Sequence, residues 1–178
     1  YISRHTNLLQ SDDKILHIAP EQSIRRVLKK QTNLKYTTAD LKSPIADIHF
    51  DVMDIPLEDN SFDVIFCNHV LEHVDNDITA MKELHRILKP GGWAVMQVPL
   101  NWDLETTFED FSITSPAERE KVFGQYDHVR WHGRDYPQRI ESVGFKVEEF
   151  KVLDFYSIKE MEYYRIDINE KMFVAFKN

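Results

Sequence analysis

The sequence predicts an α/β fold in which a mainly parallel, doubly wound sheet of seven strands carries helices on both faces. Short apolar segments of strand length alternate with segments whose apolar residues recur every three or four positions. Strands joined by helices through right-handed crossovers run parallel to one another. The last two apolar segments are expected to form a long antiparallel hairpin at the end of the chain.

Length and composition indicate one globular domain. The chain has 178 residues, of which 42% are hydrophobic and 29% are charged, and this balance is typical of a domain with its own core. The sequence contains no internal repeat, low-complexity segment or second domain, so residues 1–178 are expected to form a single unit. The apolar runs are far shorter than the roughly 20 residues that a membrane-spanning helix needs.

Charge and cysteine content exclude several classes of partner and site. The net charge of −8 would repel a phosphate backbone, which argues against binding to nucleic acid. The single cysteine, Cys67, can form neither an internal disulfide nor a cysteine zinc cluster. No secretory leader opens the sequence, so we expect a cytoplasmic protein that binds no membrane. Since the chain begins at Tyr1 and not at Met, we also expect further sequence upstream.

The first half of the chain is expected to supply four strands and one helix. The first strand is the apolar run 14–20, and a helix follows at 23–30, where Ile24, Val27 and Leu28 share one face. The fourth strand is apolar enough to be covered on both faces. The other expected strands are Tyr36–Leu41, Ile48–Val52 and Phe62–Cys67.

The second half adds helices and the remaining strands. A helix over Asp77–Lys89 is expected from its apolar stripe, and Lys-Pro-Gly-Gly at 89–92 is a stop signal for it. Ser115-Pro-Ala-Glu118 is a capping box that begins another helix. The remaining expected elements are strands at Trp93–Val98, Phe145–Phe155 and Met172–Phe176, and a helix at 137–142 that ends before Gly144.

Several blocks of sequence carry a family resemblance. Phe62–His73 reads FDVIFCNHVLEH, Glu83–Gly92 reads ELHRILKPGG, and an apolar strand follows. These blocks, with Met53–Leu57 upstream and Arg139–Phe145 downstream, resemble the class I S-adenosylmethionine-dependent methyltransferases. The run Leu16–Glu21, which contains His-Ile-Ala-Pro-Glu, is similar to a bacterial subgroup of small methyltransferases.

The resemblance implies a Rossmann-like fold and methyl transfer from S-adenosylmethionine to a small or medium-sized molecule. The sulfonium already activates the methyl group, so the protein mainly has to align the acceptor and exclude water, and no metal is expected. Ligands of doubly wound sheets bind at the carboxyl ends of the strands. We therefore expect the cofactor there.

The expected cofactor residues follow these strand ends. Asp40 ends the second strand, where an ionised carboxylate can accept hydrogen bonds from both ribose hydroxyls. The resemblance implies that Asp54 and Ile55 belong to the adenine pocket and that the end of the fourth strand contacts the methionine part. For each aspartate, the alternative is an ordinary turn or cap carboxylate. The expected cofactor set is Ala19, Pro20, Glu21, Asp40, Leu41, Asp54, Ile55, Asn68, His69 and Val70.

The first loop departs from the family pattern of an acidic residue followed by Gly-x-Gly. His17, Ala19 and Glu21 stand there, and Pro20 has no N–H to donate. We expect Glu21 to bind the cofactor's ammonium or ribose and His17 to be a buried, hydrogen-bonded strand residue. The missing glycines keep one alternative open, a methyltransferase-fold module that binds a ligand or partner without catalysis. A nicotinamide-dependent oxidoreductase is disfavoured because no Gly-x-Gly-x-x-Gly follows any strand.

The run His69–His73 also matches the His-x-x-Glu-His motif of inverted zinc proteases. That motif needs both histidines on one continuous helix. Here the preceding strand ends at Cys67 or Asn68, and the next helix cap, Asp75 or Asn76, comes after His73. A loop is therefore expected at this motif, without a metal ion.

Residues 101–136 are expected to be a lid or substrate insertion. Its densest part is Tyr126–Tyr136, YDHVRWHGRDY, and aromatic side chains are costly on a plain surface, so the run is expected to fold over the site. The alternative is a structural loop on the sheet edge. The expected roles are as follows: Arg130 or Arg134 pairs with an acidic acceptor, Tyr126 or Trp131 walls the pocket, and His128, or second His132, is the general base.

Overall fold

The computed structural model describes residues 1–168 and 171–178. Its strands are β1 (Lys14–Ile18), β2 (Lys35–Asp40), β3 (Ile48–His49), β4 (Phe62–Cys67), β5 (Leu88–Val95), β6 (Phe108–Glu109), β7 (Arg130–Trp131), β8 (Lys146–Lys151) and β9 (Lys171–Phe176). Its helices are α1 (Ile2–His5), α2 (Gln22–Leu28), α3 (Asp77–Ile87), α4 (Pro116–Phe123), α5 (Tyr136–Glu141) and α6 (Ile158–Tyr164). Two short 3-10 helices, η1 (Leu8–Gln10) and η2 (Val152–Asp154), complete the described elements.

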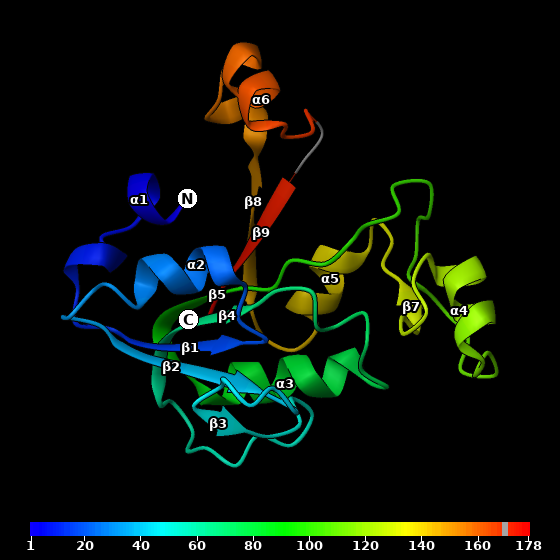
Figure 1. Ribbon diagram of the computed structural model, residues 1–178, viewed down its shortest axis with the longest axis horizontal. Helices are drawn as coiled ribbons and strands as arrows, with labels where there is room; N and C mark the ends of the chain where they lie inside the picture. The colour runs from blue at the N-terminus through cyan, green and yellow to red at the C-terminus, as the bar shows by residue number, and fades with distance from the viewer. Residues whose placement is uncertain (169–170) are drawn as a thin grey trace.

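Seven strands form one sheet in the order β3-β2-β1-β4-β5-β9-β8 (Figure 1). The pairs from β3 to β5 are parallel, whereas β9 is antiparallel to both β5 and β8. Strands β6 and β7 form a separate antiparallel pair. The predicted mainly parallel sheet with an antiparallel carboxyl-terminal hairpin is confirmed.

The largest differences from the sequence predictions lie at β5 and in the carboxyl-terminal hairpin. Strand β5 begins at Leu88, so the residues 89–92 lie in the strand, where the pairing with β4 shifts register between Phe62 and Val64. The expected hairpin is interrupted by η2 and α6. Helix α6 begins at a capping box of Ser157 and Glu160, a signal that the sequence contains and that the sequence analysis missed. Figure 1 shows α6 at the far end of the ribbon that β8 and β9 form, away from the main sheet.

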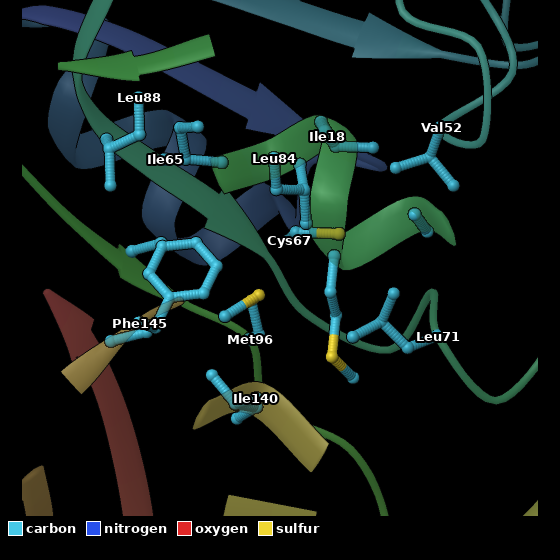
Figure 2. Packing of buried hydrophobic residues seen from close by; sticks show 14 of the residues in the cluster. Ile18, Val52, Ile65, Cys67, Leu71, Leu84, Leu88, Met96, Ile140 and Phe145 are labelled. Atoms are coloured by element: carbon cyan, nitrogen blue, oxygen red, sulfur yellow. The ribbon is translucent and has the colours of Figure 1, made fainter. Parts of the chain in front are cut away.

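Alternate side chains of the central strand enter two cores. Ile65 and Cys67 of β4 belong to the larger cluster, which packs the sheet against α3 and α5. Figure 2 shows both residues beside Leu84, with Met96 between them and Ile140. Phe66 points to the opposite side, into a smaller cluster with residues of η1 and α2. Both faces of the sheet are therefore covered, as the apolar run predicts. No helix among the described residues combines the length and apolarity needed to cross a bilayer.

A buried carboxylate ties α3 to the segment that precedes α5. Asp77, at the first turn of α3, accepts hydrogen bonds from His132 Nε2 at 3.1 Å and from Arg139 Nε at 3.0 Å and Nη2 at 2.6 Å. Burial alone would raise the pKa of Asp77, but these hydrogen bonds outweigh burial and hold its pKa well below the usual range. The ionised form is thus favoured by folding, and its contribution to stability is lost only in acid.

We predict that Asp77→Asn lowers the free energy of unfolding by about 2 to 4 kcal/mol at pH 7, because Arg139 loses the buried one of its two carboxylate partners and keeps only Glu109. Since the folded pKa is depressed, the difference from the wild type should persist down to the unfolded pKa of about 3.9 and shrink below it. Urea unfolding at several pH values measures this. Asp12→Asn, at an exposed position, is the control, and equal stability of both variants would contradict the assignment.

Candidate functional site

The expected cofactor residues lie at the edge where β1, β2 and β4 end. Strand β1 lies between β2 and β4, and Ile18 pairs with Ala39 on one side and with Cys67 on the other. The loops that follow the three strands therefore begin at the same level of the sheet. Because the strand order reverses beside β1, this edge is the switch point where ligands of such sheets bind.

Two residues at this edge have a left-handed backbone. Ala19, directly after β1, has φ +47°, and its N–H donates to the carbonyl of Ala39 at 2.8 Å. His69, just beyond β4, has φ +54°, and its N–H donates to the carbonyl of Gln97 at 2.7 Å. Such conformations cost side-chain-bearing residues about 1 kcal/mol or more and gather at binding sites. Ala19 thus adopts a turn for which glycine is the usual residue.

A chain of partly buried hydrogen bonds fixes Glu21, two residues after Ala19. The ring of His17 bridges Tyr36 Oη, at 2.8 Å from Nδ1, and Glu21 Oε2, at 2.5 Å from Nε2. The other carboxylate oxygen accepts from Asn68 Nδ2 at 2.8 Å, and Asn68 Oδ1 accepts from the N–H of Gln97 at 3.1 Å. The buried, hydrogen-bonded His17 that the sequence predicts is confirmed.

Glu21 is ionised at neutral pH. Burial acts to raise the pKa of Glu21, but the hydrogen bonds from His17 and Asn68 outweigh it and lower the pKa. Each carboxylate oxygen has two lone pairs, so each can accept a second hydrogen bond. The first loop therefore presents a fixed negative charge where the family pattern has glycine. Pro20, between Ala19 and Glu21, is half-buried.

Asp40 uses one oxygen in its own turn. Its Oδ1 accepts from the N–H groups of Lys42 and Ser43 at 2.8 and 2.7 Å, which is the cap that the alternative interpretation predicts. These bonds leave Oδ2 for other donors, so a turn cap and a ribose contact are compatible. Leu41, the next residue, is 57% exposed beside it.

The proposed adenine residues lie in different environments. Asp54 is exposed, whereas Ile55 is buried in the core. The N–H of Ile55 donates to Glu83 Oε2 at 3.0 Å, and its carbonyl accepts from Arg86 Nη2 at 2.7 Å. Ile55 therefore packs inside the protein and presents no backbone group to an adenine. Asp51, which the sequence analysis did not single out, flanks the same turn through a backbone bridge to Asp54.

Val70 also packs against the larger core, although it lies only one residue beyond the exposed His69. Of the three residues expected at the end of β4, two present polar groups toward the sheet edge and the third anchors the loop. The structure thus brings together Glu21, Asn68 and His69.

Arg130 lies inside the protein and not in a pocket. Its Nη1 donates to the carbonyls of Leu71 and Val74, at 2.5 and 2.6 Å, and Nη2 donates to the carbonyl of Asp75 at 3.1 Å. A guanidinium used in this way stabilises the loop between β4 and α3. The structure assigns Arg130 this role in place of the expected pairing with an acceptor.

The other residues of the expected lid divide into buried and exposed. His132 is fully buried and hydrogen-bonded to Asp77, so its ring is inaccessible to an acceptor. Trp131 donates from Nε1 to the carbonyl of Val122 at 3.0 Å, which holds the run against α4. Tyr126 and Arg134 are exposed, and Arg134 lies 3.6 Å from Glu105. Much of the run thus fits the alternative of a structural loop.

His128 lies in a cluster next to Glu72 and His73. Its ring packs edge to face on that of His73, with centroids 4.7 Å apart. Burial and the neighbouring His73 lower the pKa of His128, so its ring is neutral at pH 7. Glu72, whose side chain is only 2% exposed, entered the sequence analysis only as part of the His-x-x-Glu-His motif, because burial in a loop has no local sequence signal.

A cavity of about 640 Å³ opens beside the end of β4. Asn68, His69 and Gln97 form a polar part of its wall, and α1, α2 and η2 border it. Its volume falls in the range of small-molecule sites. Its large apolar residues include Tyr1, Ile24, Phe66, Phe150, Phe155, Tyr156 and Met172.

Comparison with known proteins agrees with this geometry. Residues 14–96 match a family model described as "Methyltransferase domain". Demethylmenaquinone methyltransferases of Staphylococcus epidermidis and Staphylococcus aureus are 44% and 41% identical over 61 residues, which is 34% of this chain. The match spans 25% of the length of these relatives.

Solved structures extend the likeness to nearly the whole chain. A chain in the complex of the Haloferax volcanii Trm112 methyltransferase activator and a methyltransferase has a TM-score of 0.59 at 16% identity, covering 93% of this chain and 83% of that one. The [4+2]-cyclase SpnF has a TM-score of 0.62 at 16% identity, covering 94% and 76%. Identities this low show a shared fold. Together with this shared fold, the match of residues 14–96 supports the resemblance of the chain to the class I S-adenosylmethionine-dependent methyltransferases.

Proposed function

We propose that this chain transfers a methyl group from S-adenosylmethionine to a small or medium-sized acceptor with an apolar body. The observation that carries the proposal is the convergence of Glu21, Asp40 and Asn68 on one sheet edge, next to a cavity of about 640 Å³. When bound, the cofactor supplies an activated methyl group, which needs no metal ion for its transfer.

The residues at the edge fit this cofactor. The ionised Glu21 carboxylate suits an ammonium group, and Asp40 Oδ2 suits the ribose hydroxyls. Asp54 or its neighbour Asp51 would accept from the adenine amino group. Asn68 and His69 would lie nearest the methionine part, since they end the strand beside β1. The contact from the fixed Glu21 carboxylate to the cofactor takes the place of the contacts that a glycine-rich loop makes through its backbone.

The cavity beside β4 would hold the acceptor. Its aromatic and aliphatic walls favour an apolar molecule, and its polar end, formed by Asn68, His69 and Gln97, would orient the reacting group toward the cofactor. Holding an acceptor in line and away from water is the main catalytic contribution that this reaction needs. Where the acceptor must lose a proton, we assign the base to His69, which lines the cavity, before His128 and His132, which do not.

The role of residues 101–136 as a lid stays a prediction, as do the residue assignments of Tyr126, Trp131 and Arg134. The exposed Tyr126 and Arg134 are the members of the run that an acceptor or partner can reach. A cytoplasmic location likewise stays a prediction from the composition.

The second candidate function is a methyltransferase-fold module without this catalysis. It is favoured by the absence of glycine in the first loop and by the [4+2]-cyclase among the similar structures, because that protein's name shows that the fold hosts other reactions. Thermal unfolding with S-adenosylhomocysteine, and in parallel with NAD, separates the two. We predict a rise in Tm with S-adenosylhomocysteine only. No shift with saturating S-adenosylhomocysteine would favour the module.

We predict that Asp40→Ala weakens S-adenosylhomocysteine binding by about 10- to 100-fold, the usual loss for hydrogen bonds to a charged group. Isothermal titration calorimetry measures the affinity. Asp12→Ala, at an exposed aspartate in the loop before β1, is the matched control and should bind like the wild type. Equal affinity of the wild type and Asp40→Ala would remove Asp40 from the site.

We predict that Ala19→Gly stabilises the protein by about 0.5 to 1 kcal/mol, because relief of the left-handed backbone exceeds the entropic cost of a glycine. Thermal unfolding measures the change. Ala46→Gly, at a loop position without positive φ, should destabilise by a similar amount. A loss of stability in both variants would contradict the strain at Ala19.

A further inference from the structure

We propose that Glu72, His73 and His128 form a binding site for a divalent transition-metal ion, which methyl transfer itself does not require. One potential ligand atom from each residue lies within 4.8 Å of the other two. Glu72 and His73 belong to the loop between β4 and α3, and His128 precedes β7. The proposal concerns a site that joins two segments about 55 positions apart in the sequence.

Glu72 is the observation that points to a cation. Its side chain is 2% exposed, and its Oε2 is buried without a hydrogen-bond partner among the described residues. Its Oε1 lies 3.5 Å from His69 Nδ1 and 3.9 Å from His73 Nε2, so the carboxylate faces the rings. A buried carboxylate with an unsatisfied oxygen is costly, and a bound cation would compensate its charge.

Each histidine ring is held from its outer side. His73 Nδ1 lies 3.4 Å from Asp127 Oδ2, and His128 Nδ1 lies 3.3 Å from the carbonyl oxygen of Phe123. These contacts leave Nε2 of both rings for the cluster. A metal-bound histidine typically donates its other ring N–H to a carboxylate or a carbonyl, and both partners are present here.

The donor set indicates the class of metal. Two imidazoles and one carboxylate bind zinc and iron(II) and leave further coordination positions open, whereas magnesium and calcium prefer oxygen ligands alone. Ligands of a tetrahedral zinc ion with bonds of about 2.0 to 2.1 Å lie about 3.4 Å apart. The observed spacing of up to 4.8 Å therefore needs small side-chain movements toward the ion.

The proposed site differs from the expectation, drawn from the sequence, that the His-x-x-Glu-His motif binds no metal. The motif does lie in a loop, as predicted, and not on a helix. The third ligand comes from His128, a residue that the sequence offered only as a general base. The bound ion would clamp the segment around His128 onto the loop between β4 and α3, next to the hydrogen bond from the N–H of Val129 to the carbonyl of Glu72 at 3.0 Å.

Titration of zinc into tag-free protein stripped with a chelator tests the proposal. We expect one ion per chain, a rise in Tm with zinc, and no competition by a large excess of magnesium. His73→Ala should lower zinc affinity by at least about 100-fold, and Asp127→Asn should lower it by about 10-fold through the outer contact. His49→Ala, at an exposed histidine on β3, should bind like the wild type.

Substitution at buried Glu72 or His128 can impair folding, so His73→Ala, at a partly exposed ring, carries the test. Its Tm without zinc should match that of the stripped wild type. Binding of cobalt(II), followed by visible absorption, should disappear in the same variant. Less than stoichiometric zinc in the wild type, or unchanged zinc affinity in His73→Ala, would overturn the site, whether or not S-adenosylhomocysteine binds.

Discussion

The burial of β4 on both faces is the constraint on which the rest of the molecule depends. This strand pairs with β1 on one side and β5 on the other, and its alternate residues fill the two cores. A strand covered in this way ends abruptly, since the chain must leave the core at Cys67. Asn68 and His69 follow at once, and Glu72 comes three residues later. The sheet edge and the cavity that we propose for the cofactor and the acceptor, and the cluster of Glu72, His73 and His128, are therefore all positioned by one apolar segment.

The elements that the sequence predicted well are those whose pattern is local. The burial of the run FDVIFC and of the apolar stripe of α3 can be predicted from residues that are close together in the sequence. The predicted start of β5 was wrong because Pro-Gly-Gly was interpreted as a stop between helix and strand. These residues instead belong to the strand, where the N–H of Gly91 donates to the carbonyl of Lys177 at 2.7 Å. That contact comes from the other end of the chain and has no local sequence signal. Helix α6 was missed because two flanking strand patterns suggested an uninterrupted hairpin.

The candidate site shows the same division. Asp40 could be placed from the sequence because its position at a strand end is local. The roles of Arg130 and His132 could not, because they depend on carbonyls and a carboxylate more than 50 positions away. A dense run of polar and aromatic residues indicates that the side chains make specific contacts. It does not indicate whether those contacts face solvent or the protein interior. The burial of Glu72 could not be predicted for the same reason.

The hydrogen-bonded pair of His17 and Glu21 couples two positions that a family pattern treats separately. In the usual pattern, the acidic group stands in the first strand and small residues form the loop. Here the carboxylate has moved four positions along the chain and reaches back to an imidazole. Loss of Glu21 alone would leave Nε2 of the fully buried His17 without its partner, whereas loss of His17 alone would leave Glu21 with Asn68 and solvent. A conversion between the two types of loop is therefore less costly when it begins at the histidine than when it begins at the glutamate.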